Sequence, residues 1–119
     1  MLNHTLKKSL ALLLSILVLI SSLPAIIVSA EEFTSDEGFT YEIKSDTVTI
    51  TKYNGDASDL IIPETIEGYP VTALAYYAFY GNSNLSSITI PDTITYIDYN
   101  VFTQCDNLKK VYISDLAAW

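Results

Sequence analysis

The sequence is poor in the side chains that most often carry catalysis and metal binding. It has no arginine, and its only histidine is His4. We expect His4 to be removed with the N-terminal segment described below. The remaining chain then has no Ser-His-Asp or Cys-His arrangement and no histidine ligand for a metal ion. We therefore expect a protein that is not an enzyme and that binds no metal or cofactor.

Cysteine is equally scarce, since Cys105 is the only one in 119 residues. One thiol cannot close an internal disulfide, although small secreted domains often depend on such bonds. Packing, or a neighbouring domain, must stabilise this chain instead. Lys109 and Lys110 are near enough in sequence to favour a reactive thiolate. However, Cys105 falls at the end of a repeat, and we predict that it is buried and structural.

Residues 1–30 have the pattern of a helical secretory signal peptide. Lys7 and Lys8 supply a positive start, residues 10–20 are almost all apolar, and Val28-Ser29-Ala30 offers the small side chains of a cleavage site. A retained membrane anchor is the alternative, because about 20 apolar residues can span a bilayer. A proline and two serines interrupt the apolar stretch, which favours cleavage. We expect a secreted or cell-surface protein that meets the membrane only during export.

The chain that follows this segment is strongly acidic. Its 89 residues hold four lysines against 14 aspartates and glutamates, a formal charge of −10. Such a surface repels nucleic-acid phosphates and anionic lipids. We therefore expect no nucleic-acid partner, whereas a protein or a glycan remains open.

The first part of the acidic chain predicts a leader and then a β-hairpin. Residues 31–38 are polar and acidic, which predicts a flexible leader. From Phe39 to Tyr53, apolar and polar residues alternate on both sides of Ser45-Asp46, as in two antiparallel strands joined by a tight turn. Asn54-Gly55-Asp56 is a further turn signal. We predict a hairpin cap over residues 39–58.

An internal repeat occupies most of the rest. Residues 71–90 match residues 94–113 at an offset of 23. Identical residues meet at several positions, which include Thr72 and Thr95, Tyr76 and Tyr99, Phe79 and Phe102, and Ile90 and Ile113. A partial copy lies upstream, where residues 60–63 match residues 88–91 and the connection that follows is five residues longer. The pattern predicts about two and a half coils of 23 residues.

Each copy has the pattern of one strand and one return segment. Ile88 and Ile90 should point to one face of the strand and Thr89 to the other. Pro91 ends the strand, because it has no backbone N–H to donate. One coil cannot bury its own apolar side chains, each worth about 1.5–3 kcal/mol only when fully buried. Stacked coils bury them against each other, so we predict a mostly β solenoid over residues 59–119.

These motifs resemble the BspA-type leucine-rich repeat. The strand Leu85-x-x-Ile88-x-Ile90-Pro91, the Ala78-Phe79 pair and the Asn-Leu pair that restarts each copy are similar to the family's repeat. The hairpin and residues 53–72 are similar to its N-terminal segment. The resemblance covers about residues 39–119 and implies a leucine-rich-repeat solenoid capped by the hairpin.

The resemblance also implies a bacterial secreted or cell-surface protein with an adhesion-type role, binding proteins of a host or a neighbouring cell. The alternative is a structural spacer, or the N-terminal fragment of a larger multidomain surface protein, with no ligand of its own. The sequence after Leu108 starts another coil without a polar cap, so the repeats look incomplete at this end. This predicts truncation, further domains, or edge-to-edge self-association through residues 108–119. Ala75 and Asp98 stand where the family commonly has glycine, which affects only the detail of the coil.

The outward positions of the stacked strands are the predicted contact surface, because they form one continuous sheet face. These residues are Ile61, Ser87, Thr89, Lys110 and Tyr112. Tyrosine is a second signal, since all nine tyrosines follow residue 30. Tyrosine is common at interfaces, but packing between coils would explain the repetition of Tyr76 at Tyr99 equally well.

Paired carboxylates are the remaining candidates for a site. Glu64 and Glu67 flank the longer connection, and Asp56 and Asp59 follow the Asn54-Gly55 turn. Acid–base catalysis needs carboxyl groups in a pocket with shifted pKa values, whereas these lie in turn-like, solvated segments. A Ca²⁺ site at Asp56 and Asp59 is a minor alternative. We interpret all four as residues that form turns and confer solubility.

Overall fold

The computed structural model describes residues 31–114. Within this range the chain forms nine β-strands and no helix, so the described part holds no helix able to cross a membrane. The signal peptide predicted over residues 1–30 lies outside the described residues, as do residues 115–119 of the predicted self-association segment.

The cap is the hairpin of β2 (Phe39–Lys44) and β3 (Thr47–Tyr53), which pair antiparallel. Its turn residues Ser45 and Asp46 have positive φ angles of 52° and 59°, a geometry that matches the right-handed twist of the two strands. The alternating apolar residues are buried: Phe39, Tyr41, Val48, Ile50 and Tyr53. The hairpin predicted from the alternation is therefore confirmed.

The segment before the hairpin is partly ordered, which corrects the prediction of a flexible leader over residues 31–38. Glu32–Thr34 form strand β1, which pairs antiparallel with β2. All three side chains are exposed, so backbone bonds hold the strand. The Phe33 ring adds a contact with Tyr41, with 5.8 Å between ring centroids. A strand this short and this polar has no alternation that sequence reasoning could detect.

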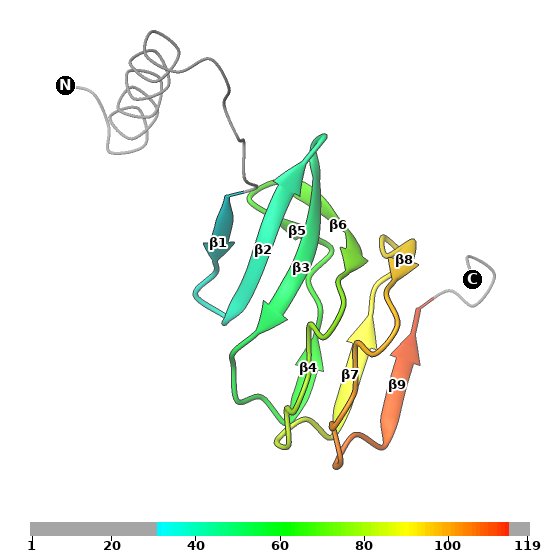
Figure 1. Ribbon diagram of the computed structural model, residues 1–119. Helices are drawn as coiled ribbons and strands as arrows, with labels where there is room; N and C mark the ends of the chain where they lie inside the picture. Colours follow the sequence, from blue (N-terminus) through cyan, green and yellow to red (C-terminus); the bar gives the residue numbers. More distant parts are fainter. Residues whose placement is uncertain (1–30, 115–119) are drawn as a thin grey trace, which may run out of the picture.

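The strands of successive coils form two sheets (Figure 1). One continues from β3 to β6 (Tyr69–Leu74) and β8 (Tyr96–Ile97) by parallel pairing. The other consists of β4 (Asp59–Ile61), β7 (Ser87–Ile90) and β9 (Lys110–Ile113), all parallel. The short β5 (Thr65–Ile66) pairs antiparallel with β6. The described residues thus form a mostly β, leucine-rich-repeat-like structure.

The strand registers confirm the spacing of the repeat. Ala73 pairs with Tyr96 and Ser87 pairs with Lys110, each at an offset of 23. Asp59 pairs with Ser87 at an offset of 28. The additional five residues are those of the longer first connection, which contains β5. The number of coils in the whole chain stays a prediction.

One apolar core runs through the cap and the coils. The burial pattern of β7 alternates as predicted, with Ile88 and Ile90 inside. A row of aromatic rings links the elements, with centroid distances of 5.0 Å for Phe39–Tyr53, 5.7 Å for Tyr53–Phe79 and 5.6 Å for Phe79–Phe102. Each such pair contributes roughly 0.5–1.5 kcal/mol beyond its burial. The cap and the repeats are therefore packed as one unit.

Candidate functional site

The strands β4, β7 and β9 present their outward side chains as two parallel rows. One row holds Ile61, Thr89 and Tyr112. The other row holds Asp59, Ser87 and Lys110. Residues two apart in a strand point to the same side, so both rows lie on one surface, which we call the strand face. It contains all five residues that the sequence predicted as contact positions.

The exposure of the strand face follows from the alternation along each strand. Leu60 and Ile88 point inward and are 8% and 0% exposed. Ile61 and Tyr112 point outward and are 72% and 52% exposed. Ser87 and Thr89 of the central strand are half-buried between their neighbours, and Lys110 is exposed. The large side chains of Ile61 and Tyr112 therefore stand at opposite edges of the strand face, and the small polar side chains of β7 lie between them.

Asp59 is the member of the strand face that sequence reasoning missed. The Ser87 hydroxyl donates a hydrogen bond to Asp59 Oδ1 across the strand pair. The signal was present, because the match of residues 60–63 with residues 88–91 extends by one residue to Asp59. The second row thus runs from a carboxylate on β4 to an ammonium group on β9. Such a charge order favours one orientation of a bound partner.

Four tyrosines in the return segments form a second exposed surface, which we call the tyrosine cluster. Its members are Tyr76, Tyr77, Tyr80 and Tyr99, which are 39–73% exposed. The ring centroids of Tyr76 and Tyr99 are 4.9 Å apart although the residues belong to successive copies of the repeat. Tyr76 and Tyr99 thus pack against each other between copies and are also exposed on the surface. A hydrogen bond with Tyr76 raises the pKa of the Tyr77 hydroxyl.

The four carboxylates that the sequence offers as candidates lie in different surroundings. The Tyr41 hydroxyl donates a 2.8 Å hydrogen bond to Glu67 Oε1. Burial, together with this bond, raises the pKa of Tyr41 to about 12. Asp59 belongs to the strand face, and Glu64 is exposed. Within residues 31–114, no three Asp, Glu, His or Cys side chains come together as a metal site would require.

Cys105 is buried, as predicted. Its thiol donates a hydrogen bond to the Phe79 carbonyl at 2.9 Å. Burial raises the pKa of the thiol, as is typical of a structural rather than a reactive cysteine.

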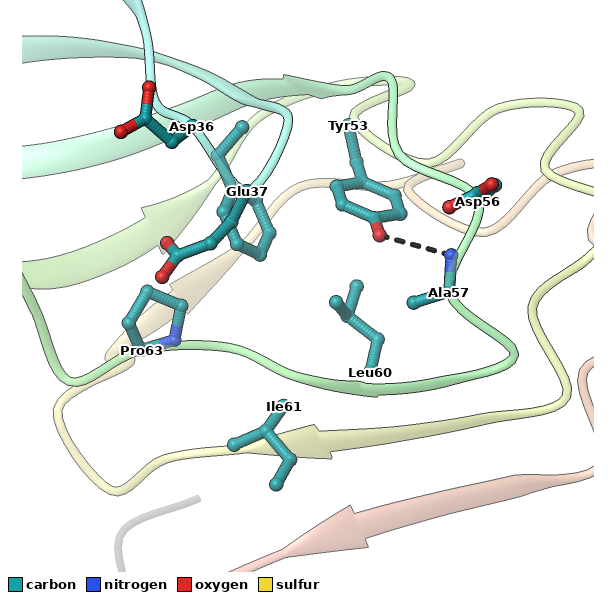
Figure 2. A pocket seen from close by; sticks show the side chains of 9 residues that line it. Asp36, Glu37, Tyr53, Asp56, Ala57, Leu60, Ile61 and Pro63 are labelled. Carbon is teal, nitrogen blue, oxygen red and sulfur yellow. Dashed lines mark hydrogen bonds between the residues drawn. The ribbon is translucent and has the colours of Figure 1, made fainter.

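A cavity of about 460 Å³ opens beside β4 (Figure 2). Buried apolar side chains line it, namely Phe39, Tyr53 and Leu60, with the partly exposed Pro63 and Ala57. Its exposed lining consists of Ile61 and three carboxylates, those of Asp36, Glu37 and Asp56. The Tyr53 hydroxyl accepts a hydrogen bond from the Ala57 N–H at 3.3 Å, which fixes the ring in the wall. Sequence reasoning missed this cavity, because the β1–β2 turn, the hairpin and the first repeat strand each supply part of it.

Comparison with known proteins identifies a family match. The family model described as "BspA type Leucine rich repeat region (6 copies)" matches residues 40–117, more than half of the chain. No curated protein gives a significant match.

Solved structures of bacterial proteins are similar to this chain. A leucine-rich repeat protein of T. pallidum is 30% identical with a TM-score of 0.62, over 66% of this chain and 38% of that one. A leucine-rich repeat protein of Bacteroides capillosus is 30% identical with a TM-score of 0.62, over 71% and 67%. A leucine rich cell surface protein of Faecalibacterium prausnitzii is 36% identical with a TM-score of 0.63, over 73% and 24%. The chain therefore spans well under half of the first and third of these proteins.

Proposed function

The chain belongs to the BspA-type leucine-rich repeat family, and we propose that it is a secreted or cell-surface protein that binds another protein through its strand face. The observation that carries this proposal is the pair of side-chain rows on β4, β7 and β9. Three successive strands present outward residues in register, while the inward residues of β4 and β7 are buried.

The chemistry of the strand face suits a protein partner. Tyr112 and Ile61 offer large exposed areas that a partner can cover, and tyrosine is among the residues that contribute most to binding energy. Asp59 and Lys110 place opposite charges at the two edges of the sheet, which would orient the partner. A glycan that carries charged groups is a less favoured occupant of the same surface.

Export to the cell surface is part of the proposal. The pattern of residues 1–30 supports it, with two lysines before an apolar run and small residues at its end. The F. prausnitzii structure, 36% identical, is of a protein described as a cell surface protein. An adhesion-type role, in which the partner belongs to a host or a neighbouring cell, is part of the same proposal. No enzyme activity is proposed.

A binding experiment with matched variants tests the proposal. The full 119-residue chain is immobilised and exposed to a cell-surface protein extract, and captured proteins are then measured for affinity. Lys110→Ala with Tyr112→Ala should weaken binding about tenfold or more and leave the thermal melt nearly unchanged, because both side chains are exposed. Lys44→Ala with Tyr96→Ala removes the same two side-chain types from exposed positions outside the strand face.

The control variant, Lys44→Ala with Tyr96→Ala, should bind the captured partner with full affinity. A captured partner that binds the Lys110→Ala, Tyr112→Ala variant as tightly as the original chain would contradict the proposal. Protease treatment of the extract separates a protein partner from a glycan, since only a protein partner is lost.

A structural role as a spacer or as one part of a larger surface protein is the second candidate. It is favoured by the fact that the chain spans 38% and 24% of two of the similar proteins. Val111, at 46% exposed on β9, is also much more open than Ile88, its buried equivalent on β7. Self-association through residues 108–119 would cover it. Light scattering across a range of concentrations tests this, and a monomer at all concentrations argues against self-association.

A further inference from the structure

At the cap end of the molecule, one sheet ends at β1 and the other ends at β4. One sheet continues past β3 with β2 and β1, whereas in the other sheet no described strand lies beyond β4 (Figure 1). The coil that contains β4 contributes β6 to the first sheet, and beyond β6 that sheet has three further strands, β3, β2 and β1, so it overhangs the β4 edge. We call the space below this overhang the notch.

The edge of β4 that faces the notch has free hydrogen-bonding groups. Residues that alternate along a parallel strand bond to opposite neighbours. The Ser58 carbonyl accepts a bond from Ser87 N–H at 3.1 Å, and Ile62 N–H donates to the Thr89 carbonyl at 3.0 Å, so these residues face β7. The backbone groups of Asp59 and Ile61, which alternate with them, face the other way. Within the described residues β4 pairs only with β7, which leaves these groups for another strand.

The cavity beside β4 lies in this notch. Asp36 and Glu37 line it from the turn between β1 and β2, with the Asp36 carboxylate pointing away from its centre, while Leu60, Ile61 and Pro63 belong to the β4 segment (Figure 2). Its volume of about 460 Å³ lies within the range of small-ligand pockets and leaves room for one long side chain. The residues that line it include three carboxylates and no basic side chain.

We propose that the notch binds an extended peptide segment of a partner, which adds a strand to the edge of β4 and places a lysine or arginine side chain in the cavity. Strand addition uses the free backbone groups of Asp59 and Ile61. The apolar wall accommodates the aliphatic stem of a long cationic side chain, and the negative rim, with Glu37 at one end and Asp56 at the other, attracts its charged head (Figure 2). An acidic segment would be repelled by the same rim.

A peptide fits the notch better than the other occupants. A metal ion would lack ligands, because no three potential ligands come together within residues 31–114. A second copy would extend the β4 sheet through its β9 edge, where Lys110 lies. However, a whole coil has one strand in each of two sheets, and the cap strands β3, β2 and β1 already occupy the place beside β6 that its second strand would need. A single extended strand has no such conflict.

The test is fluorescence anisotropy of the full chain with labelled hexapeptides. The probe alternates threonine and lysine, and its control has glutamate in place of each lysine. We expect the lysine peptide to bind at least tenfold more tightly, with an affinity that falls as salt is added. N-methylation of alternate backbone nitrogens should abolish binding, because it removes the donors of the added strand. Equal binding of the lysine and glutamate peptides, or no effect of N-methylation, would overturn the proposal.

Variants of the chain provide the second arm. Glu37→Gln with Asp56→Asn should weaken the lysine peptide about three- to tenfold, whereas Glu64→Gln with Asp92→Asn, exposed carboxylates that do not line the cavity, should have no effect. Full affinity in the first variant would refute the assigned role of the rim. Light scattering that shows a self-associated species, lost in Glu37→Gln with Asp56→Asn, would instead assign the notch to a second copy.

This inference can fail separately from the proposed function. Apart from Ile61 and the backbone of Asp59, the notch shares no residue with the strand face. The Lys110→Ala, Tyr112→Ala variant should therefore still bind the lysine peptide.

Discussion

Ile90 and Ile113 allow a direct test of how the coils stabilise each other. They are the same residue at equivalent positions, paired across β7 and β9. Ile90 is 1% exposed, whereas Ile113 is only partly buried on the last strand of the described residues. Replacement by alanine removes three carbons, worth about 0.8 kcal/mol each when fully buried. With the energy of the cavity left behind, Ile90→Ala should lower the free energy of unfolding by about 3–4 kcal/mol.

Ile113→Ala should lower the free energy of unfolding by about half as much or less. The Ile113 side chain is already partly in water, and fewer neighbours enclose the space that it leaves. Urea unfolding of the full chain, followed by circular dichroism, gives both values from the midpoints at a common slope. A domain of this size has a free energy of unfolding of only about 5–15 kcal/mol. Ile90→Val, at about 0.5–1.5 kcal/mol, is therefore the milder companion if Ile90→Ala does not fold. Equal losses at the two positions would refute the view that neighbouring coils provide the burial.

Further predictions concern single positions. The pKa of Tyr41 in the folded state, about 12, lies above its ordinary value of 10.0, so its contribution to stability is present below pH 10 and is lost between pH 10 and 12. Tyr41→Phe should remove this part of the pH dependence, up to about 2 kcal/mol, in urea titrations at several pH values. Gly38→Ala should destabilise by about 1–3 kcal/mol, because φ is 90° and the added carbon would lie 2.9 Å from Gly55 N. Gly68→Ala, with φ of 84° but open space around it, should cost less in the same assay. The Cys105 thiol should react slowly with a maleimide in the folded protein and rapidly in urea, and immediate reaction without urea would contradict its burial.

The repeat and the strand face could be predicted from the sequence, because both depend on local patterns. The offset of 23 between the two copies aligns Ser87 with Lys110, and the strands pair in that register. The alternation around Thr89 assigned inward and outward positions, since successive side chains of a strand point to opposite faces. The hairpin turn at Ser45-Asp46 followed from the same alternation on either side of it.

The features that sequence reasoning missed depend on how separate elements meet. Strand β1 is three residues long and its side chains are all exposed, so its backbone pairing with β2 defines it. The notch exists because one sheet has three strands at the cap, β1, β2 and β3, where the other has none among the described residues, and no local pattern contains that difference. Its cavity draws Glu37 and Leu60 from segments that are more than twenty residues apart in sequence. Asp56 was therefore interpreted as a turn residue, with a Ca²⁺ site as a minor alternative, although it lines this cavity.

The most direct test of strand-face binding is a hydroxyl-radical footprint of the full chain, free and bound to a captured partner. Tyr112 on the strand face and Tyr96 outside it are 52% and 58% exposed, so they should be oxidised at similar rates in the free chain. We expect the partner to protect Tyr112 and to leave Tyr96 unchanged. A complex in which Tyr112 is oxidised as fast as in the free chain would contradict binding through the strand face.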